Sequence, residues 1–220
     1  TSILCSQYFG AKRRDKVIQV VGISLLFNLF SGLLLSLCLY FFAGNFLHMM
    51  GLRPDLMSYG LPYMKIVGGF AFLQAVSLSL SASLRSANKA KYPMYISLVV
   101  NVLNIIGNYT LIFGKFGMPA LGVEGAAIST SVCRFVSVVI LLVVLFKKHI
   151  PSFPKELFTP FPWIELKNLL KIGLPSAGEH MSYSLSQVVI AYFINMISNQ
   201  ALATRTYVVN IVMFTYIFAL

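Results

Sequence analysis

Long stretches without a charged side chain are the feature that most limits what this chain can fold into. Residues 17–52, 66–84, 92–114 and 180–204 contain no Asp, Glu, Lys or Arg. A helix needs about 20 mostly apolar residues to cross the hydrocarbon core of a bilayer. Charged residues make up 10% of the chain, against about 25% in a typical soluble domain. We therefore predict an all-α integral membrane protein, a polytopic helical bundle.

The apolar stretches predict six helices and part of a seventh. The six cover residues 17–43, 56–84, 92–114, 122–146, 168–197 and 200–220. Residues 1–10 are interpreted as the end of a preceding helix, which stops at Gly10. Because the chain lacks an initiator Met and begins and ends inside predicted helices, we expect it to be a fragment of a longer protein.

Lysines and arginines concentrate on alternate connections, which predicts the orientation of the spans. Three connections carry four, three and five of them, and the two alternate connections carry one each: residues 11–16, 85–91 and 147–171 against 44–55 and 115–121. Basic loops stay on the cytoplasmic side of a membrane. We expect loops 11–16, 85–91 and 147–167 in the cytoplasm. The net charge of +11 is then mainly topological, and no nucleic-acid partner is expected.

The connection 147–167 is the best domain boundary in the chain. It holds four of the nine prolines, and proline-rich sequence does not continue a helix. Its last residues, Trp163–Leu166, mix apolar and acidic side chains, which suits an amphipathic segment at the membrane interface. The boundary separates a bundle over residues 1–146 from a second bundle that begins at residues 168–220.

Motifs of catalysis and metal binding are missing from the sequence. The three cysteines show no C-x-x-C spacing, the three histidines are scattered, and there is no Walker loop or G-x-G-x-x-G. The sequence therefore predicts neither an enzyme nor a metal site.

Several short blocks, in this order, resemble one family, the multidrug and toxic compound extrusion (MATE) transporters. They are Gln7–Ala11, Leu84–Ala87, Asn101–Tyr109, Leu111–Gly114, Leu121–Ala127, Gly173–Pro175 and Ala201–Ala203. The resemblance implies a twelve-helix, two-lobed transporter fold, of which this chain runs from the end of helix 2 to within helix 8. Residues 1–146 would be most of the N-terminal lobe, 147–167 the interlobe connection, and 168–220 the start of the C-terminal lobe.

The same resemblance implies a function. Members are secondary active transporters that export organic compounds or drugs in exchange for H+ or Na+, by alternating access. For this chain it implies a multi-pass protein of the cell membrane, with the lipid bilayer and a small organic, cationic substrate as partners. The coupling ion would replace any cofactor, and we expect a monomer at full length.

Glu179 is the one acidic residue well inside a predicted span. A charge there costs about 2.5–3.5 kcal/mol on insertion scales, so such residues mark functional sites. Tyr183 and Gln187 follow at helical spacing on the same face, and we take this face as a candidate cavity lining. In many family members the acidic residue lies one turn later, where this chain has Tyr183. The alternative is a Glu near the helix end whose side chain reaches the interface.

A polar stripe of Ser97, Asn101, Asn104 and Asn108 runs along one face of the 92–114 helix. Side-chain oxygens suit a hard cation, but Asn also joins membrane helices by hydrogen bonds. In some family members an Asn, an Asp four residues later and a Thr of the next helix hold a cation. The resemblance implies Asn104, Asn108 and Thr130 for these roles, with Asn108 in place of the Asp.

Two cations inside spans are further candidates for the substrate cavity. Arg134 lies near the middle of the 122–146 helix, and Arg205 lies in the last helix. Buried cations usually face a bundle interior and find partners there. Either can contact an anionic group, although Arg205 can equally extend to the outer interface.

Two other functions remain open at this point. The first is a flippase for lipid-linked precursors, which shares the two-lobed fold and would use Arg134 and Arg205 for an anionic headgroup. The second is a non-transporting membrane scaffold, which needs neither Glu179 nor the polar stripe.

Overall fold

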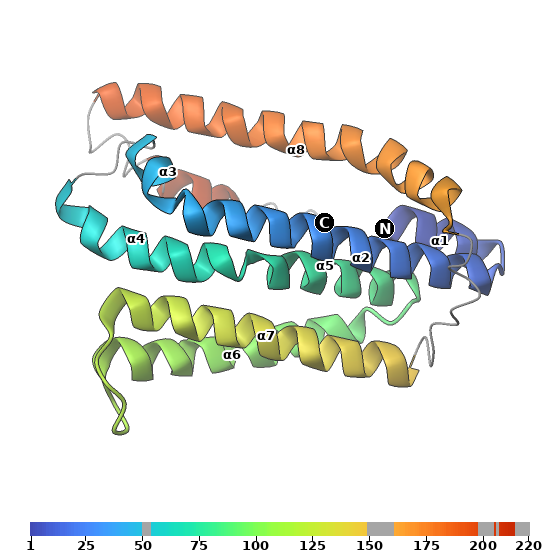
Figure 1. Ribbon diagram of the computed structural model, residues 1–220, viewed down its shortest axis with the longest axis horizontal. Helices are drawn as coiled ribbons and strands as arrows, with labels where there is room; N and C mark the ends of the chain where they lie inside the picture. Colours follow the sequence, from blue (N-terminus) through green and yellow to red (C-terminus); the bar gives the residue numbers. More distant parts are fainter. Residues whose placement is uncertain (50–53, 149–160, 198–204, 206, 214–220) are drawn as a thin grey trace. The chain divides into compact units, whose positions relative to one another are not determined.

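The computed structural model describes residues 1–49, 54–148, 161–197, 205 and 207–213, and all regular elements in these ranges are helices (Figure 1). The prediction of an all-α fold is confirmed. The chain forms two compact units, residues 1–169 and 170–220. Within the described part of the first unit lie the helices α1 (Ser2–Gly10), α2 (Arg14–Phe41), α3 (Ala43–Met49), α4 (Pro54–Gly69), α5 (Ala71–Ser86), α6 (Lys91–Phe113) and α7 (Gly122–Lys148). Helix α8 (Trp163–Ile197) begins in the first unit and continues into the second.

Helices α5 and α7 form the centre of the first unit. Helix α5 packs against α1, α2 and α7, and α7 also packs against α4 and α6. The side chains that are most deeply buried come from these contacts: Val20, Val21, Ile23, Leu80, Leu84, Leu141 and Leu145. Many other large apolar side chains are exposed, and the most apolar stretch of α6 has no buried residue. Apolar surface on that scale fits a protein whose solvent is lipid.

Helix ends differ from the predictions in three places. Helix α2 begins at Arg14, inside the predicted loop 11–16, and the short α3 occupies part of the predicted loop 44–55. Helix α8 begins at Trp163, inside the predicted connection. In α2 and α8 an acidic side chain, Asp15 or Glu165, lies in the first turn, where it stabilises the positive end of the helix dipole. Charged residues at these two places therefore mark the start of a helix rather than a loop.

The prediction of one continuous helix over residues 56–84 is wrong. The chain bends by 41° between α4 and α5, at Phe70. The backbone N–H of Phe72 donates to Ser36 Oγ of α2 at 2.9 Å, instead of to a carbonyl of its own helix. Gly68 and Gly69, just before the bend, offer little resistance to it, and an outside side chain that enters the hydrogen-bond ladder is a recognised cause of a kink.

Among the described residues, three helices are long and apolar enough to cross a membrane, and the bent pair α4–α5 makes a fourth if it counts as one span. They are Asp15–Phe41, Lys91–Phe113 and Gly122–Lys147. Residues 168–197 are helical as predicted, within α8, but α8 is not one of these candidate spans. Of the predicted helix 200–220, residues 205 and 207–213 are helical, and the rest lies outside the described residues, as do residues 149–160 of the interlobe connection.

Candidate functional site

Helices α6 and α7 form an antiparallel hairpin whose seam is built on two glycines. A methyl group at Gly107 would overlap Ser129 Oγ, and one at Gly125 would lie 2.5 Å from the carbonyl oxygen of Leu111. Small residues of this kind let two helix backbones approach closely, as is typical of membrane bundles. Since Gly107 lies against Ser129 and Gly125 against Leu111, the register of the two helices is fixed at two points.

This register brings Asn104, Asn108 and Thr130 to one side of the seam. Asn108 follows Gly107, and Thr130 follows Ser129, so each side chain is turned about 100° from the contact. In an antiparallel pair these two rotations point to the same side. Asn104, one turn before Asn108, shares that side, and all three residues are half-buried. The opposite side of α7 carries the exposed side chains of Val132, Phe135 and Val139.

Hydrogen bonds leave one acceptor of this cluster without a partner. Asn108 Nδ2 donates to Asn104 Oδ1 at 3.1 Å, and Ser129 Oγ donates to the Asn104 carbonyl at 3.4 Å. The Thr130 hydroxyl donates to the carbonyl of Ala126 at 2.8 Å, so its oxygen lone pairs remain available. Among the described residues, nothing donates to the buried Oδ1 of Asn108. A buried acceptor of this kind is costly unless a donor or a cation satisfies it.

Asn101 lies one turn before Asn104 on the polar side of α6, whereas Arg134 lies nine residues after Gly125 and therefore on the side of α7 that is turned away from α6. The register places them at the same level, one turn from Asn104. Asn101 is exposed and Arg134 is half-buried. The register therefore adds Asn101, and not Arg134, to the polar side of the seam.

In the second unit, Glu179, Tyr183 and Gln187 follow one another along α8, and Pro175 lies inside that helix without ending it. Glu179 and Tyr183 are exposed, and Gln187 is half-buried. Arg205 Nη2 donates to Gln187 Oε1 at 2.6 Å and to the Gln187 carbonyl at 3.3 Å. Two sequence-predicted residues, Gln187 and Arg205, are thus in direct contact.

Sequence reasoning missed a buried carboxylate in the first turn of α8. Glu165 is 2% exposed, and it accepts hydrogen bonds from Tyr8 Oη and Lys16 Nζ, both at 2.8 Å. Its neighbours Trp163 and Ile164 are exposed, so this segment turns its charge inward and its apolar side chains outward. The mixed polarity of Trp163–Leu166 was the available signal, but it did not tell which side chains face the protein.

Clusters of metal ligands do not occur in the part of the chain that the structure describes: nowhere there do three His, Cys, Asp or Glu side chains gather. The three cysteines are free thiols. The candidate residues are therefore amides, hydroxyls, two arginines and one carboxylate.

Long apolar helices with a half-buried polar side on the α6–α7 seam are typical of a polytopic membrane protein. The model of the MatE family matches residues 1–110, and the chain belongs to this family of transporters. The match begins in α1 and ends in α6, so it includes Asn101, Asn104 and Asn108.

Curated relatives agree with the family. An uncharacterized transporter, YisQ of Bacillus subtilis, is 39% identical over 219 residues, which are 99% of this chain and 48% of the relative. A protein of Thermotoga maritima named probable multidrug resistance protein NorM is 32% identical over 160 residues, 73% of this chain and 34% of the relative. The chain spans about half the length, or less, of the curated relatives it matches.

Two solved structures share the fold. One, described as the inward-facing conformation of a multidrug resistance MATE family transporter, superposes with a TM-score of 0.81 over 97% of this chain and 48% of its own. The other, a MOP superfamily transporter from Pyrococcus furiosus, gives a TM-score of 0.84 over 96% of this chain and 46% of its own. Both are 21% identical to this chain, so they bear on the fold alone.

Proposed function

We propose that this chain is part of a secondary active transporter that exports small organic, cationic compounds in exchange for H+ or Na+. The observation that carries the proposal is the polar side of the α6–α7 seam, with Asn104, Asn108 and Thr130 around a buried oxygen that lacks a donor among the described residues. Amide and hydroxyl oxygens are ligands that a hard cation accepts. Family membership supplies the wider context of transport.

Coupling requires that the cation and the substrate favour different states of the protein. In our proposal Glu179 takes the coupling ion in the second unit, and Tyr183 and Gln187 line the substrate cavity beside it. Arg205 holds Gln187 in place through its hydrogen bond to Oε1. Two lobes that rock about a central cavity would then give alternating access.

The proposal includes a topology. The protein lies in the cell membrane as a monomer, with the basic loops 11–16, 85–91 and 147–167 in the cytoplasm. The distribution of lysine and arginine along the sequence supports this orientation. Cysteines introduced one at a time into these loops of the complete transporter test it, because only those on the outer surface react with an impermeant thiol reagent in intact cells.

Transport by the complete protein in proteoliposomes tests the function. We expect accumulation of an organic cation to be driven by a pH gradient or by a Na+ gradient, each imposed alone. Accumulation that neither gradient drives, or translocation of a lipid-linked precursor instead, would overturn the proposal.

A pair of variants connects the function to the seam. We expect Asn108→Ala to weaken ion-driven export on the order of tenfold, equivalent to about 1.4 kcal/mol. Thr110→Ala is the matched control, because the Thr110 hydroxyl lies on the same helix and donates to the Gly107 carbonyl instead of joining the cluster. Equal losses in both variants would show that the seam is only a packing surface.

A further inference from the structure

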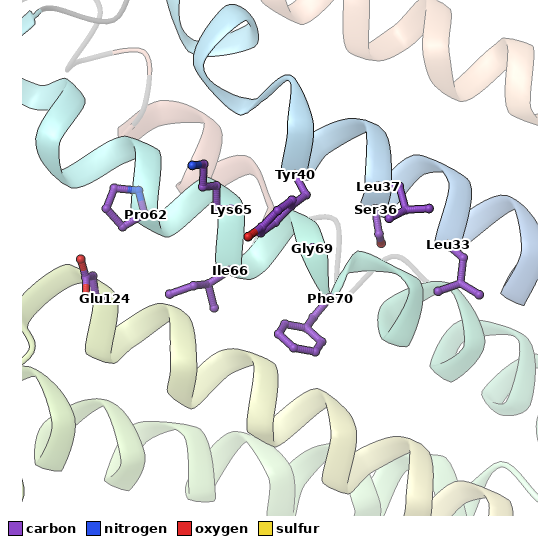
Figure 2. A pocket seen from close by; sticks show the side chains of 10 residues that line it. All are labelled: Leu33, Ser36, Leu37, Tyr40, Pro62, Lys65, Ile66, Gly69, Phe70 and Glu124. Carbon is purple, nitrogen blue, oxygen red and sulfur yellow. The ribbon is translucent and has the colours of Figure 1, made fainter.

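A pocket of about 510 Å³ lies where α2, α4 and α7 meet at the bend before α5 (Figure 2). The bend creates it, because Gly69 and Phe70 at the break form one wall. Ser36 of α2, which accepts the Phe72 N–H and so helps to hold the bend open, lies in the same wall. The pocket is therefore a consequence of the broken helix, and it is separate from the polar side of the α6–α7 seam.

Two opposite charges line this pocket without pairing with each other. Lys65 Nζ lies 5.9 Å from the ring centroid of Tyr40, in a cation–π contact, and Glu124 lies in the first turn of α7. Both side chains are exposed, and among the described residues neither makes an ion pair. The pocket thus offers one positive and one negative group to the same occupant.

The charges and the apolar side chains occupy different ends of the pocket. Lys65 and Glu124 lie toward the end where α2 stops and α7 starts, whereas Leu33 and Phe70 lie toward the middle of the helices (Figure 2). Leu33 and Phe70 are 40% and 47% exposed. A polar end at the helix termini and an apolar end deeper along the helices match the order of headgroup and acyl chains in a bilayer leaflet.

We propose that this pocket binds a glycerophospholipid with a zwitterionic, primary-amine headgroup, as in phosphatidylethanolamine. Lys65 takes the phosphate by charge-assisted hydrogen bonds, and Glu124 takes the ammonium. A primary ammonium has three N–H donors and can donate hydrogen bonds to the Glu124 carboxylate. A quaternary ammonium has no N–H and offers only its charge. The acyl chains lie on Leu33, Leu37 and Phe70. This lipid site goes beyond the proposed function, because the proposal of a bound lipid does not depend on which compound the protein transports.

Native mass spectrometry of the complete transporter, titrated with dioleoyl phosphatidylethanolamine, phosphatidylcholine or phosphatidylglycerol, tests the site. We expect wild type to bind the ethanolamine lipid about five to tenfold more tightly than the choline lipid, and Glu124→Gln to remove that preference. Lys65→Gln is expected to weaken the binding of both lipids about tenfold, and Lys65→Arg is expected to restore it.

Two matched controls remove a charge outside the pocket. Lys115→Gln takes a cation from the loop between α6 and α7, and Asp15→Asn takes a carboxylate from the first turn of α2. We expect both to bind lipid as wild type does, and a comparison of melting temperatures without lipid shows that every variant is folded. Unchanged binding in Lys65→Gln and Glu124→Gln, equal losses in the controls, or displacement of the lipid by the exported compound would each overturn the proposal.

Discussion

Two carboxylates on one helix have opposite surroundings. Glu165, in the first turn of α8, is 2% exposed and accepts two hydrogen bonds, from Tyr8 and Lys16. Glu179, farther along the same helix, is exposed and makes no ion pair with any described residue. The first carboxylate is held by its neighbours, while the second has no structural partner in the part of the chain that the structure describes.

The difference separates a structural acid from a candidate functional one. Burying a carboxylate costs free energy unless a cation and hydrogen bonds compensate for it, and Lys16 and Tyr8 provide both around Glu165. Nothing comparable explains an acidic side chain at Glu179, which precedes a charge-free stretch of sequence. We therefore expect Glu165 to matter for stability and Glu179 for transport.

The largest expected effect is that of Glu179→Gln on transport. The amide keeps the size of the side chain but cannot exchange a proton or neutralise a cation, so ion-driven export should fall on the order of a hundredfold, equivalent to about 2.8 kcal/mol. Export by the complete protein in proteoliposomes, under a pH gradient and under a Na+ gradient, measures it. Because Glu179 is exposed, the melting temperature should stay near that of wild type.

Binding of the exported compound to the Glu179→Gln variant, measured without an ion gradient, separates a role of Glu179 in coupling from a role in substrate binding. If Glu179→Gln exports at the wild-type rate, Glu179 is an interfacial acid and the contrast with Glu165 is lost. The substitution Glu179→Asp is not a neutral control, because the shorter side chain moves the charge. Ser182→Ala, at an exposed residue of α8 to which the proposal assigns no role, is the better control.

Glu165→Gln is expected to have the next largest effect, and on stability. It would replace a buried, paired carboxylate by a neutral amide and leave Lys16 without its counter-charge, at a cost of about 1.5–3 kcal/mol in the free energy of unfolding. Chemical unfolding of the complete transporter in detergent measures this loss. Export per folded molecule should remain close to wild type, and a selective loss of export in a stable variant would contradict the assignment.

Most of the long helices, and the residues that share a face of each, could be predicted from the sequence, because both depend on local periodicity. The spacing of Asn101, Asn104 and Asn108 placed them on one face of α6, and the register of α6 and α7 adds Thr130 to the same side. The position of Thr130 on the same side as the asparagines could not be predicted, since it depends on the register of the two helices, which the contacts at Gly107 and Gly125 set.

Features that depend on a partner distant in sequence were not predictable. The helix over residues 56–84 breaks where Ser36 accepts the N–H of Phe72, and nothing near Phe72 in the sequence announces that contact. Glu165 is buried because Tyr8 of α1 and Lys16 of α2 reach it. Local sequence rules treat the N–H of Phe72 as part of a regular helix and Glu165 as an exposed side chain. In both cases a hydrogen bond from a distant segment decides otherwise.

A smaller effect is expected from Tyr8→Phe. The change removes one hydrogen bond to Glu165 Oε2 and keeps the ring, while Lys16 continues to neutralise the carboxylate. We expect a loss of about 1 kcal/mol in the free energy of unfolding. The double variant Tyr8→Phe, Glu165→Gln should lose less than the sum of the two single variants, because they remove the same contact. Strict additivity would show that Tyr8 does not contribute through Glu165.

The smallest effect is expected at Asp15, an exposed carboxylate in the first turn of α2. Its contribution is limited to the helix dipole, because the structure gives it no ion pair among the described residues. Asp15→Asn should change the free energy of unfolding by about 0.5 kcal/mol or less, and salt should reduce even that. The same unfolding measurement at low and high ionic strength checks it. A loss as large as that of Glu165→Gln would mean that burial and partners do not separate the carboxylates of this protein.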